Sequence, residues 1–568
     1  MGRLGIEFVA MNPGTSIDAL LDSLVQYEGK YPQVVLCCHE EIAVAIADGY
    51  ARIKGKPMAV MVHDQVGLQH ASKAIFESYI DRLPMLVIGG TGPLAVEKRR
   101  PRLDWVHTAK VTADLVRGYV KWDDEPSDVT GAVDSVLRGY NVSVTPPMGP
   151  VYLSYDVTLQ EQKLNKKVNF PNLERFRAPT PPQMDEQSLG KVAKDLVDAK
   201  NPVIVTEYSG RNPNTFSHLV NLAELLSIPV IDQDACLNFP NSNELDVTGA
   251  EEEILKDADL VLGIDLMGIE QALTSPGDGG RDPRTKVPLV QESTPIVLIG
   301  LEHYSISGWC SNYRKLWPVD LTVSADSAVA VPALASKCKE IMNPSMQGLR
   351  DERRRYAARI HKRLRDAWQE QAKKDWNAKP ISTARLASEL WKLISEENWF
   401  LGHGSLNGWV RKLWTLDDPR RYIDPGISTG SGLGISIGMV LAVKEPESLF
   451  LSIVGDGDML YTPSALWTAA NMKIPMLVIM FNNQSYYATV AHSRALARAR
   501  NRDASKALVG TRLSNPVTDF AQLAKSFGLN GVGPVEEPNE LPEAIQTGLS
   551  LLKKEGKLVL VDVVTQPR

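Results

Sequence analysis

Short apolar runs that end in small or polar residues recur along this chain, and segments with a helical spacing of apolar residues separate them. Strands of parallel sheets form such continuous apolar runs, because helices cover both faces of the sheet. The alternation of strands and helices predicts an α/β fold with three doubly wound domains and mostly parallel sheets. The expected domains span residues 1–165, 183–345 and 375–568.

The same pattern locates the individual elements. Strands are expected at 8–10, 34–38, 58–62, 85–89, 203–206, 230–232, 260–264, 296–299, 399–401, 449–454 and 476–481. Helices are expected at 40–53, 69–79, 216–226 and 349–368, the last of them a basic, solvated connection. A polar stretch at 161–172 and a proline-rich stretch at 179–182 predict a linker between the first two domains.

Composition narrows the class of protein. The 568 residues carry a net charge of −6, which argues against nucleic acid as a general partner. No apolar run is long enough to span a bilayer and no signal peptide is visible, so we expect neither a membrane partner nor secretion. The five cysteines have neither metal-like spacing nor an even count, which fits a reducing, cytoplasmic location.

The most specific chemical signal is Gly-Asp-Gly at 455–457, which 24 intervening residues separate from Asn482-Asn483. Each motif directly follows an apolar run, and a helical segment lies between the two runs. Such a unit joins neighbouring parallel strands, so Asp456 and Asn483 are expected at adjacent carboxyl ends, where α/β sheets bind ligands. A carboxylate, an amide oxygen and a nearby backbone carbonyl form a hard oxygen site, which suits Mg²⁺ bound to a diphosphate.

Two further observations concern the context of this motif. Thr462 and Pro463 predict the N-cap and the first turn of the intervening helix. A second Gly-Asp-Gly, at 277–279, follows no strand and precedes no pair of asparagines. Because context decides whether such a motif binds a ligand, we expect the second copy to be a loop.

Gly-Asp-Gly followed by Asn-Asn resembles the thiamine diphosphate signature of the 2-oxo acid decarboxylases and acetolactate synthases. The resemblance implies thiamine diphosphate and Mg²⁺ as cofactors, with a pyrimidine-binding first domain, a central domain and a diphosphate-binding third domain. It implies Asp456, Asn483 and the backbone carbonyl of Ser485 as metal ligands. The other residues that it implies at the cofactor are Gly404, Ser405, Gly432, Leu433, Gly455, Gly457, Asp458 and Tyr486.

The segment from Cys38 to Arg52 resembles the family's segment that bears the cofactor-activating glutamate, which makes Glu40 the activator. A carboxyl group bonded to the pyrimidine nitrogen favours the imino tautomer, which can take the thiazolium proton. The alternative is an acidic residue in the first turn of a helix, a role that Glu41 would fill equally well. Leu433 would similarly either wedge the cofactor into its bent shape or be a core leucine.

Candidate substrate residues come from similarity to the benzoylformate decarboxylase branch of the family. Thr15 takes the place of a serine near the substrate, and His63 that of a histidine able to shuttle protons. Thr15 could equally be a helix cap, and His63 a satisfied structural histidine. Gln65 lies in a turn that departs from the usual glycine-rich form. Segment 265–271 lacks the second histidine of that branch, so benzoylformate itself is a doubtful substrate.

The segment after the paired asparagines carries Tyr486, His492 and several arginines up to residue 502. We expect either a lid that contributes anion-binding groups, with His492 near the substrate, or an exposed basic helix.

The resulting hypothesis is a thiamine diphosphate- and Mg²⁺-dependent lyase that decarboxylates a small-molecule 2-oxo acid, with or without ligation to an aldehyde or ketone. The alternatives are an acetolactate synthase-like carboligase, an acyl-CoA lyase or decarboxylase, and an inactive cofactor-binding regulatory protein. Whether the central domain holds a flavin or nucleotide stays open, because no complete Gly-x-Gly-x-x-Gly occurs there. The resemblance also implies a homodimer or homotetramer in which the first domain of one subunit faces the third domain of its partner.

Overall fold

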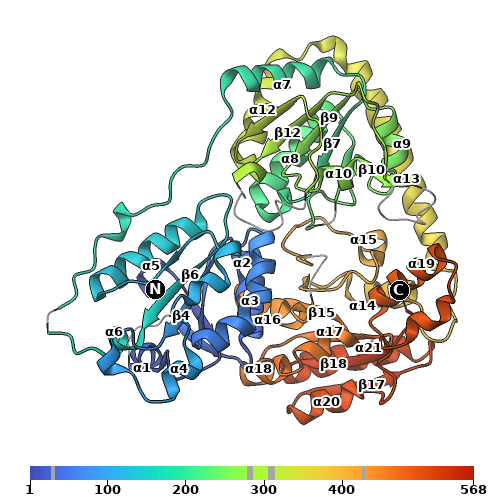
Figure 1. The fold of residues 1–568 in the computed structure, drawn as a ribbon. Coiled ribbons are helices and arrows are strands. Elements are labelled where there is room, and N and C mark those ends of the chain that lie inside the picture. Colours follow the sequence, from blue (N-terminus) through green and yellow to red (C-terminus); the bar gives the residue numbers. More distant parts are fainter. Residues whose placement is uncertain are drawn as a thin grey trace.

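The computed structural model describes residues 1–26, 32–165, 167–233, 235–277, 286–304, 314–424 and 429–567. Its strands form three larger sheets flanked by helices, and one two-stranded hairpin (Figure 1). Every described strand pair of the three larger sheets is parallel. The predicted α/β class with mostly parallel sheets is therefore confirmed. Each larger sheet lies within one predicted domain range, and the exact domain limits remain predictions.

The first sheet has the strand order β2-β1-β3-β4-β6-β5. Its strands are β1 (Phe8–Met11), β2 (Gln33–Leu36), β3 (Met58–Val62), β4 (Met85–Thr91), β5 (Asp123–Asp124) and β6 (Pro150–Asp156). Its helices are α1 (Asp18–Gln26), α2 (Glu40–Lys54), α3 (Asp64–Ile80), α4 (Leu103–His107), α5 (Val129–Val144) and α6 (Val157–Glu161). The inner strands are completely buried, which explains their continuous apolar runs. The edge strand β2 ends before Cys37, so the predicted strand at 34–38 is too long.

The second sheet has the order β13-β12-β9-β7-β8. Its strands are β7 (Pro202–Thr206), β8 (Val230–Asp232), β9 (Leu260–Ile264), β12 (Ile296–Gly300) and β13 (Leu321–Ser324), and the separate hairpin is β10 (Thr274–Pro276) with β11 (Lys286–Pro288). Its helices are α7 (Glu186–Asp198), α8 (Pro213–Leu226), α9 (Glu251–Lys256), α10 (Ile269–Ala272) and α12 (Ser327–Ile341). The expected loop at 277–279 lies outside the described residues except for Gly277.

The third sheet has the order β14-β15-β16-β18-β17. Its strands are β14 (Trp399–Leu401), β15 (Leu449–Gly455), β16 (Leu477–Asn482), β17 (Asn530–Val535) and β18 (Val559–Val564). Its helices are α14 (Thr383–Ile394), α15 (Trp409–Leu413), α16 (Gly432–Ala442), α17 (Asp456–Tyr461), α18 (Ala465–Asn471), α19 (Tyr487–Ala499), α20 (Phe520–Ser526) and α21 (Leu541–Glu555). Thr462 was predicted to cap the helix between the two motifs, and this prediction is wrong. Helix α18 begins three residues later, and the Thr462 hydroxyl instead donates to the Gly430 carbonyl at 2.5 Å.

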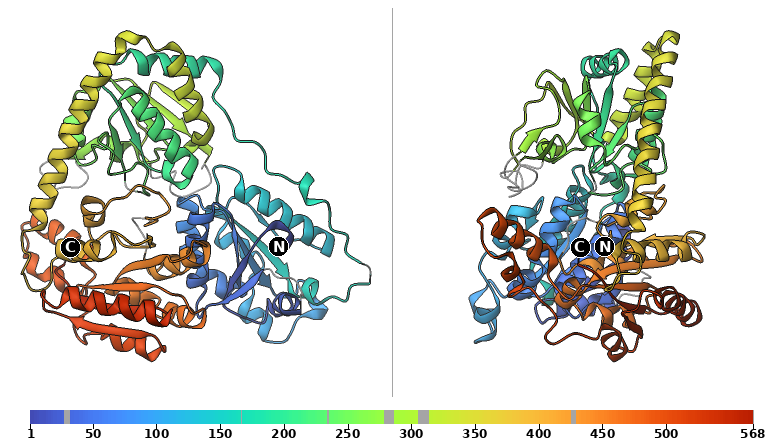
Figure 2. Two further views of the ribbon diagram at one scale, coloured as in Figure 1. Left: turned by 180° about the vertical axis from the view of Figure 1, so that it is seen from behind. Right: turned by 90° about the vertical axis from the view of Figure 1, so that its right-hand side faces the viewer.

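The long helix α13 (Gln347–Ala372) runs along the second sheet and down to the third part of the chain (Figure 2). The expected basic helix at 349–368 is therefore present, but it is not wholly solvated. Arg353 is buried and donates to the carbonyls of Lys200 at 3.0 Å and Leu226 at 2.9 Å. In the described part of the chain, no helix combines the length and the apolar character needed to cross a membrane.

The first and third parts meet through α2 and α16, which pack backbone against backbone. A methyl group on Gly49 would lie 1.9 Å from the Ile435 carbonyl oxygen, and one on Gly438 would lie 2.0 Å from the Ile46 carbonyl oxygen. Glycine is therefore required at both positions, because any side chain would separate the helices. In this structure the contact lies within one chain, whereas the family resemblance implied that two subunits form it.

A buried ionic network holds the C-terminal half of α2. Arg52 donates to Asp48 at 2.6 Å and to Asp81, and Arg211 of the second sheet's region reaches Asp81 at 2.9 Å. The Arg52 side chain is only 6% exposed. Removing one partner from a buried network leaves uncompensated charge, which costs far more than the loss of an exposed pair.

We expect Arg52→Ala to lower the free energy of unfolding by about 3–5 kcal/mol, because Asp48 and Asp81 then remain buried without their main cation. Urea unfolding followed by circular dichroism measures the change. The matched control is Arg138→Ala, which removes an exposed pair with Asp134 and should cost less than about 1 kcal/mol. Equal shifts for the two variants would contradict this prediction.

Candidate active site

Asp456 and Asn483 lie at the carboxyl ends of the neighbouring strands β15 and β16, as their motif predicts. The backbone N–H of Ser485 lies 3.0 Å from Asp456 Oδ2 and 3.1 Å from Asn483 Oδ1. Because both oxygens contact one amide, the two side chains converge on the same point. The positive φ of 54° at Gln484 bends the chain so that Ser485 can reach both.

Burial gives Asp456 unusual electrostatics. Its side chain is 2% exposed, and desolvation raises its pKa to about 6, even though the backbone N–H groups of Gly457 and Ser485 oppose the shift. A buried carboxylate beside an amide oxygen is a donor set for a hard divalent cation. The residues present therefore fit Mg²⁺.

The glycines around this point leave open space beside Gly455 and allow close approaches of other side chains to the backbone at Gly457 and Gly432. A methyl group on Gly455 would meet no atom within 4 Å, so open space adjoins Asp456. By contrast, a methyl group on Gly457 would lie 2.7 Å from the Tyr486 ring, and one on Gly432 would lie 2.7 Å from Asp458 Oδ2. Such a cradle fits a diphosphate group, which backbone N–H groups bind well.

The turn after β14 contributes the remaining predicted diphosphate residues. Gly404 has φ of +101°, and a methyl group there would lie 2.3 Å from the Ile453 carbonyl oxygen, so the turn requires glycine. Ser405 follows it, and its carbonyl accepts from the Val410 N–H at 3.1 Å. His403, which precedes Gly404, lies 3.3 Å from Asp424 and 3.9 Å from Asp458.

Glu40 begins α2 and is buried at 3% exposure. Its Oε1 accepts from Asn12 Nδ2 at 3.1 Å, and its Oε2 lies 3.0 Å from His70 Nδ1. Neither Asn12 nor His70 was among the predicted site residues. Asn12 lies beyond β1 and His70 on α3, so the contacts join segments that are remote in sequence. The Glu40 carboxyl is thus buried and fixed by two contacts, and it is not a solvent-exposed charge at the end of a helix.

The start of α2 also adjoins the loop that leads into α16. Lys73 Nζ lies 3.2 Å from Glu41 Oε1 and 2.8 Å from Ser431 Oγ. A methyl group on Gly430 would lie 3.3 Å from Glu41 Oε1. Leu433, in the first turn of α16, is buried in the same hydrophobic core as α2. The Glu40 end and the diphosphate end are therefore neighbours.

The candidate substrate residues are only partly brought together. His63 Nδ1 lies 2.9 Å from the hydroxyl of Ser16, not of Thr15, which is exposed. Burial lowers the pKa of His63, and its ring lies 5.5 Å from that of His107. Among the described residues, Gln65 Oε1 and His107 Nδ1 are buried without a hydrogen-bond partner. The sequence did not predict Ser16 or His107 as site residues. The unsatisfied atoms of Gln65 and His107 fit a polar ligand.

The segment after Ser485 forms α19, on which His492 is exposed. No hydrogen bond or ion pair within the described residues joins His492 to Glu40, His63 or Asp456. Tyr486 lies nearer the predicted site, because its ring approaches Gly457 and lies 6.3 Å from the Tyr461 ring. The basic-helix alternative therefore describes the exposed part of this segment better than a closed lid.

Both ends of this candidate site lie in segments that match known protein domains. Residues 1–111 match the thiamine pyrophosphate enzyme N-terminal TPP binding domain, and residues 402–563 match the corresponding C-terminal TPP binding domain. The acetolactate synthase large subunit of Haemophilus influenzae is 22% identical over 98% of this chain and 92% of its own length.

The chain carries both binding domains of a thiamine diphosphate-dependent enzyme, and it is similar to acetolactate synthases and decarboxylases. The Bacillus subtilis acetolactate synthase is also 22% identical, over 98% of this chain and 90% of that protein. Two solved structures share the fold of this thiamine diphosphate enzyme. Benzoylformate decarboxylase of Polynucleobacter necessarius aligns with a TM-score of 0.76 and 18% identity, over 100% of this chain and 97% of that one. The 4-hydroxybenzoylformate decarboxylase of Rhodococcus jostii aligns with a TM-score of 0.73 and 18% identity, over 99% and 97%.

Proposed function

We propose that this enzyme decarboxylates a 2-oxo acid, with or without ligation of the product to a carbonyl acceptor, using Mg²⁺ and thiamine diphosphate. The observation that carries the proposal is the buried Glu40 carboxyl, held by Asn12 and His70 and carried by a helix that packs on α16 of the diphosphate end. This arrangement supports the proposal, because the buried Glu40 carboxyl and the Asp456–Asn483 oxygen pair then belong to one structural unit.

Each proposed residue has a definite task. Asp456, Asn483 and the Ser485 carbonyl would hold Mg²⁺, and Gly404, Ser405, Gly432, Gly455, Gly457, Asp458 and Tyr486 would surround the diphosphate. Leu433 would support the bent cofactor, and Glu40 would hold a proton at the pyrimidine nitrogen. When bound, thiamine diphosphate would supply the nucleophilic carbon and the electron sink that decarboxylation requires. His63, neutral because its pKa is lowered, would accept or return a proton beside the substrate.

The identity of the substrate is tested by offering a panel of aliphatic and aromatic 2-oxo acids and measuring release of carbon dioxide. Product analysis with and without an added aldehyde or ketone then distinguishes simple decarboxylation from ligation. The acetolactate synthase relatives favour ligation of two 2-oxo acid units as the second candidate. Failure to turn over any 2-oxo acid, with cofactor bound, would overturn the proposal in favour of an acyl-CoA substrate or a regulatory role.

The raised pKa of Asp456 predicts a pH dependence of cofactor stabilisation. In the apoenzyme, a pKa raised from 3.8 to about 6 contributes stability that is present below about pH 4 and is lost as the pH rises through about 6. A bound cation favours the ionised carboxyl, so the stabilisation by Mg²⁺ and thiamine diphosphate should grow between pH 5 and pH 7.5. Thermal melting with and without both cofactors measures it.

The control for this pH effect is Asp456→Asn, which keeps the shape and removes the ionisation. Any pH dependence that remains in this variant reports ionisation of the diphosphate itself. If the wild type and Asp456→Asn gain equally with pH, Asp456 does not bind the metal as a carboxylate.

We also propose that the active unit is a homodimer or homotetramer. The described residues between α6 and α7 contain only one short helical turn, Leu173–Arg175, so this long connection could let the first part pack on a partner's third part. Sedimentation gives the subunit number. Recovery of activity on mixing inactive Glu40→Gln and Asp456→Ala chains would show that subunits share the site, whereas the contact within one chain seen here gives no recovery.

A further inference from the structure

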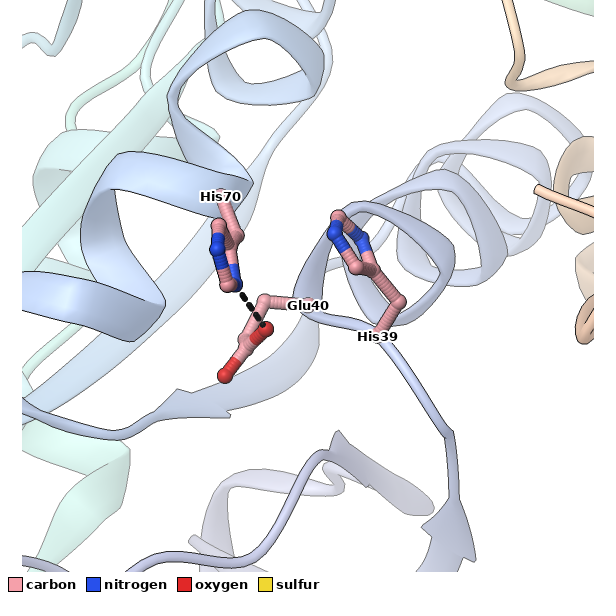
Figure 3. Close-up of side chains that lie close together, drawn as sticks. All are labelled: His39, Glu40 and His70. Atoms are coloured by element: carbon pink, nitrogen blue, oxygen red, sulfur yellow. Dashed lines mark hydrogen bonds and ion pairs between the residues drawn. The ribbon is translucent and has the colours of Figure 1, made fainter. Parts of the chain in front are cut away.

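A cluster of three side chains connects the buried Glu40 carboxyl with the surface of the enzyme. Figure 3 shows His70 of α3 above Glu40, with a hydrogen bond to one carboxyl oxygen, and His39 beside them. The Glu40 side chain is 4% exposed, whereas the His70 side chain is 48% exposed. His70 is therefore in contact with the carboxyl on one side and with solvent on the other.

Two residues of helix α3 contact the Glu40 carboxyl. Gly67 and His70 are three residues apart and so share one face of α3. A methyl group on Gly67 would lie 2.9 Å from Glu40 Oε1, so the carboxyl reaches the helix only because residue 67 has no side chain. Asn12 holds Oε1 from the other side at 3.1 Å, which leaves Oε2 directed at His70 Nδ1.

His39 supports the ring of His70 without touching the carboxyl through a hydrogen bond. Its Nδ1 accepts from the Glu41 N–H at 3.2 Å, which caps α2 and places any proton of the neutral ring on Nε2. The two imidazole rings stack with centroids 4.7 Å apart and planes inclined by 21°. Stacking limits the rotation of His70 and so maintains its orientation toward Oε2.

His39, Glu40 and His70 also place three ligand-type atoms within 4.8 Å of one another, but the rings do not suit a metal ion. A metal lies in the plane of each imidazole that binds it, along the nitrogen lone pair. Two stacked rings that are nearly parallel have no common point near both nitrogens. The geometry therefore favours a hydrogen-bonded arrangement.

We propose that His70 is a positioning residue for Glu40 and carries protons between its buried carboxyl and solvent. This inference rests on the proposed role of Glu40 at the cofactor. Decarboxylation of a 2-oxo acid anion to an aldehyde and carbon dioxide takes up one proton, so the enzyme needs a path from solvent to the buried site. His70 provides one, because imidazole both accepts and donates protons near neutral pH.

Each proton that leaves His70 is replaced. When His70 supplies a proton to the ionised Glu40 carboxyl, its Nδ1–H bond breaks and that proton forms a bond with Oε2, while Nε2 takes a proton from solvent. The imidazole remains neutral in its other tautomer. In the opposite direction, Oε2 returns the proton to Nδ1 and Nε2 releases one to solvent, which restores the first tautomer.

The variant His70→Asn tests the two proposed roles of His70 separately, because it retains a hydrogen bond to the carboxyl but removes the group that carries the proton. The asparagine Nδ2 takes the place of the imidazole Nδ1 as a donor to Oε2, but an amide does not titrate. We expect this variant to bind Mg²⁺ and thiamine diphosphate with nearly wild-type affinity by calorimetry. Exchange of the cofactor's thiazolium proton with deuterium, measured by NMR without substrate, should slow by roughly 10²-fold, the lower range for a lost proton-transfer group. Added imidazole should restore part of the exchange rate in His70→Ala.

The matched control is His39→Asn, which removes the other ring of the stack but keeps a good N-cap. This variant retains the group that carries the proton and loses only a contact that orients it, so it should slow the exchange far less than His70→Asn. Wild-type exchange in His70→Asn at saturating cofactor, or no response of His70→Ala to imidazole, would overturn the proposal for His70. If Glu40→Gln also exchanges at the wild-type rate, the proposed role of Glu40 fails as well, so the two failures can be told apart.

Discussion

Asp456→Ala is expected to abolish Mg²⁺-dependent binding of thiamine diphosphate. Asp456 is the one carboxylate of the proposed metal site, and it shares the Ser485 N–H with the Asn483 amide. Disturbing the surroundings of a metal ligand typically costs roughly 10–100-fold in affinity, so loss of the ligand itself should exceed that range. Isothermal calorimetry with cofactor, with and without Mg²⁺, measures the loss.

The chain offers a control that is matched in burial and acidity. Asp562 on β18 is also buried, and burial also raises its pKa to about 6, but it bonds Asn482 at 3.0 Å and not the proposed site. Asp562→Ala should retain Mg²⁺-dependent binding in the fraction that remains folded by thermal melting. Unchanged cofactor affinity in a folded Asp456→Ala enzyme would remove Asp456 from the metal site.

Glu40→Gln is expected to bind cofactor and to lose roughly 10²–10⁴ in turnover, as for a removed acid–base group. Glutamine preserves the size of the side chain and its Oε1 contact with Asn12, but it cannot share a proton with the pyrimidine. Thiazolium proton exchange, followed by quenching and NMR, should slow with turnover, while calorimetry should show retained binding.

Glu41→Gln serves as the comparison, because Glu41 lies in the same first turn of α2 but pairs with Lys73 at 3.2 Å. We expect it to exchange nearly as fast as the wild type. The reverse result, with slow Glu41→Gln and normal Glu40→Gln, would place the activating carboxyl one residue further along the chain.

Local pattern was enough to predict much of the fold. β9 has the predicted limits, and β15 extends the predicted run by one residue, because strands buried on both faces consist of continuous apolar residues. The Gly-Asp-Gly and Asn-Asn motifs lie at the predicted strand ends for a similar reason, since strand ends are marked by abrupt changes from apolar to polar residues. Thr462 shows where local reasoning fails, because a hydrogen bond to the distant Gly430 competes with the capping role.

The residues that were missed act through contacts that periodicity does not encode. His70 and Asn12 reach Glu40 only because α3 and the end of β1 converge on α2. Ser16, not Thr15, meets His63, because the turn after β1 directs the adjacent side chain inward. One signal was available for the helix contact: Gly434 and Gly438 lie one turn apart on α16, and such spacing is typical of closely approaching helices.

The glycine-mediated contact between α2 and α16 also fixes a distance inside the enzyme, namely the separation between the first turns of the two helices. Glu40 begins one helix and Leu433 lies in the first turn of the other, so their separation depends on two backbones in direct contact and not on the settings of long side chains. Backbones in contact yield little to compression. For a cofactor that binds between these two ends of one chain, we expect its length to match this separation, so that an analogue with a longer or shorter bridge between its ring system and its charged end would satisfy one end only.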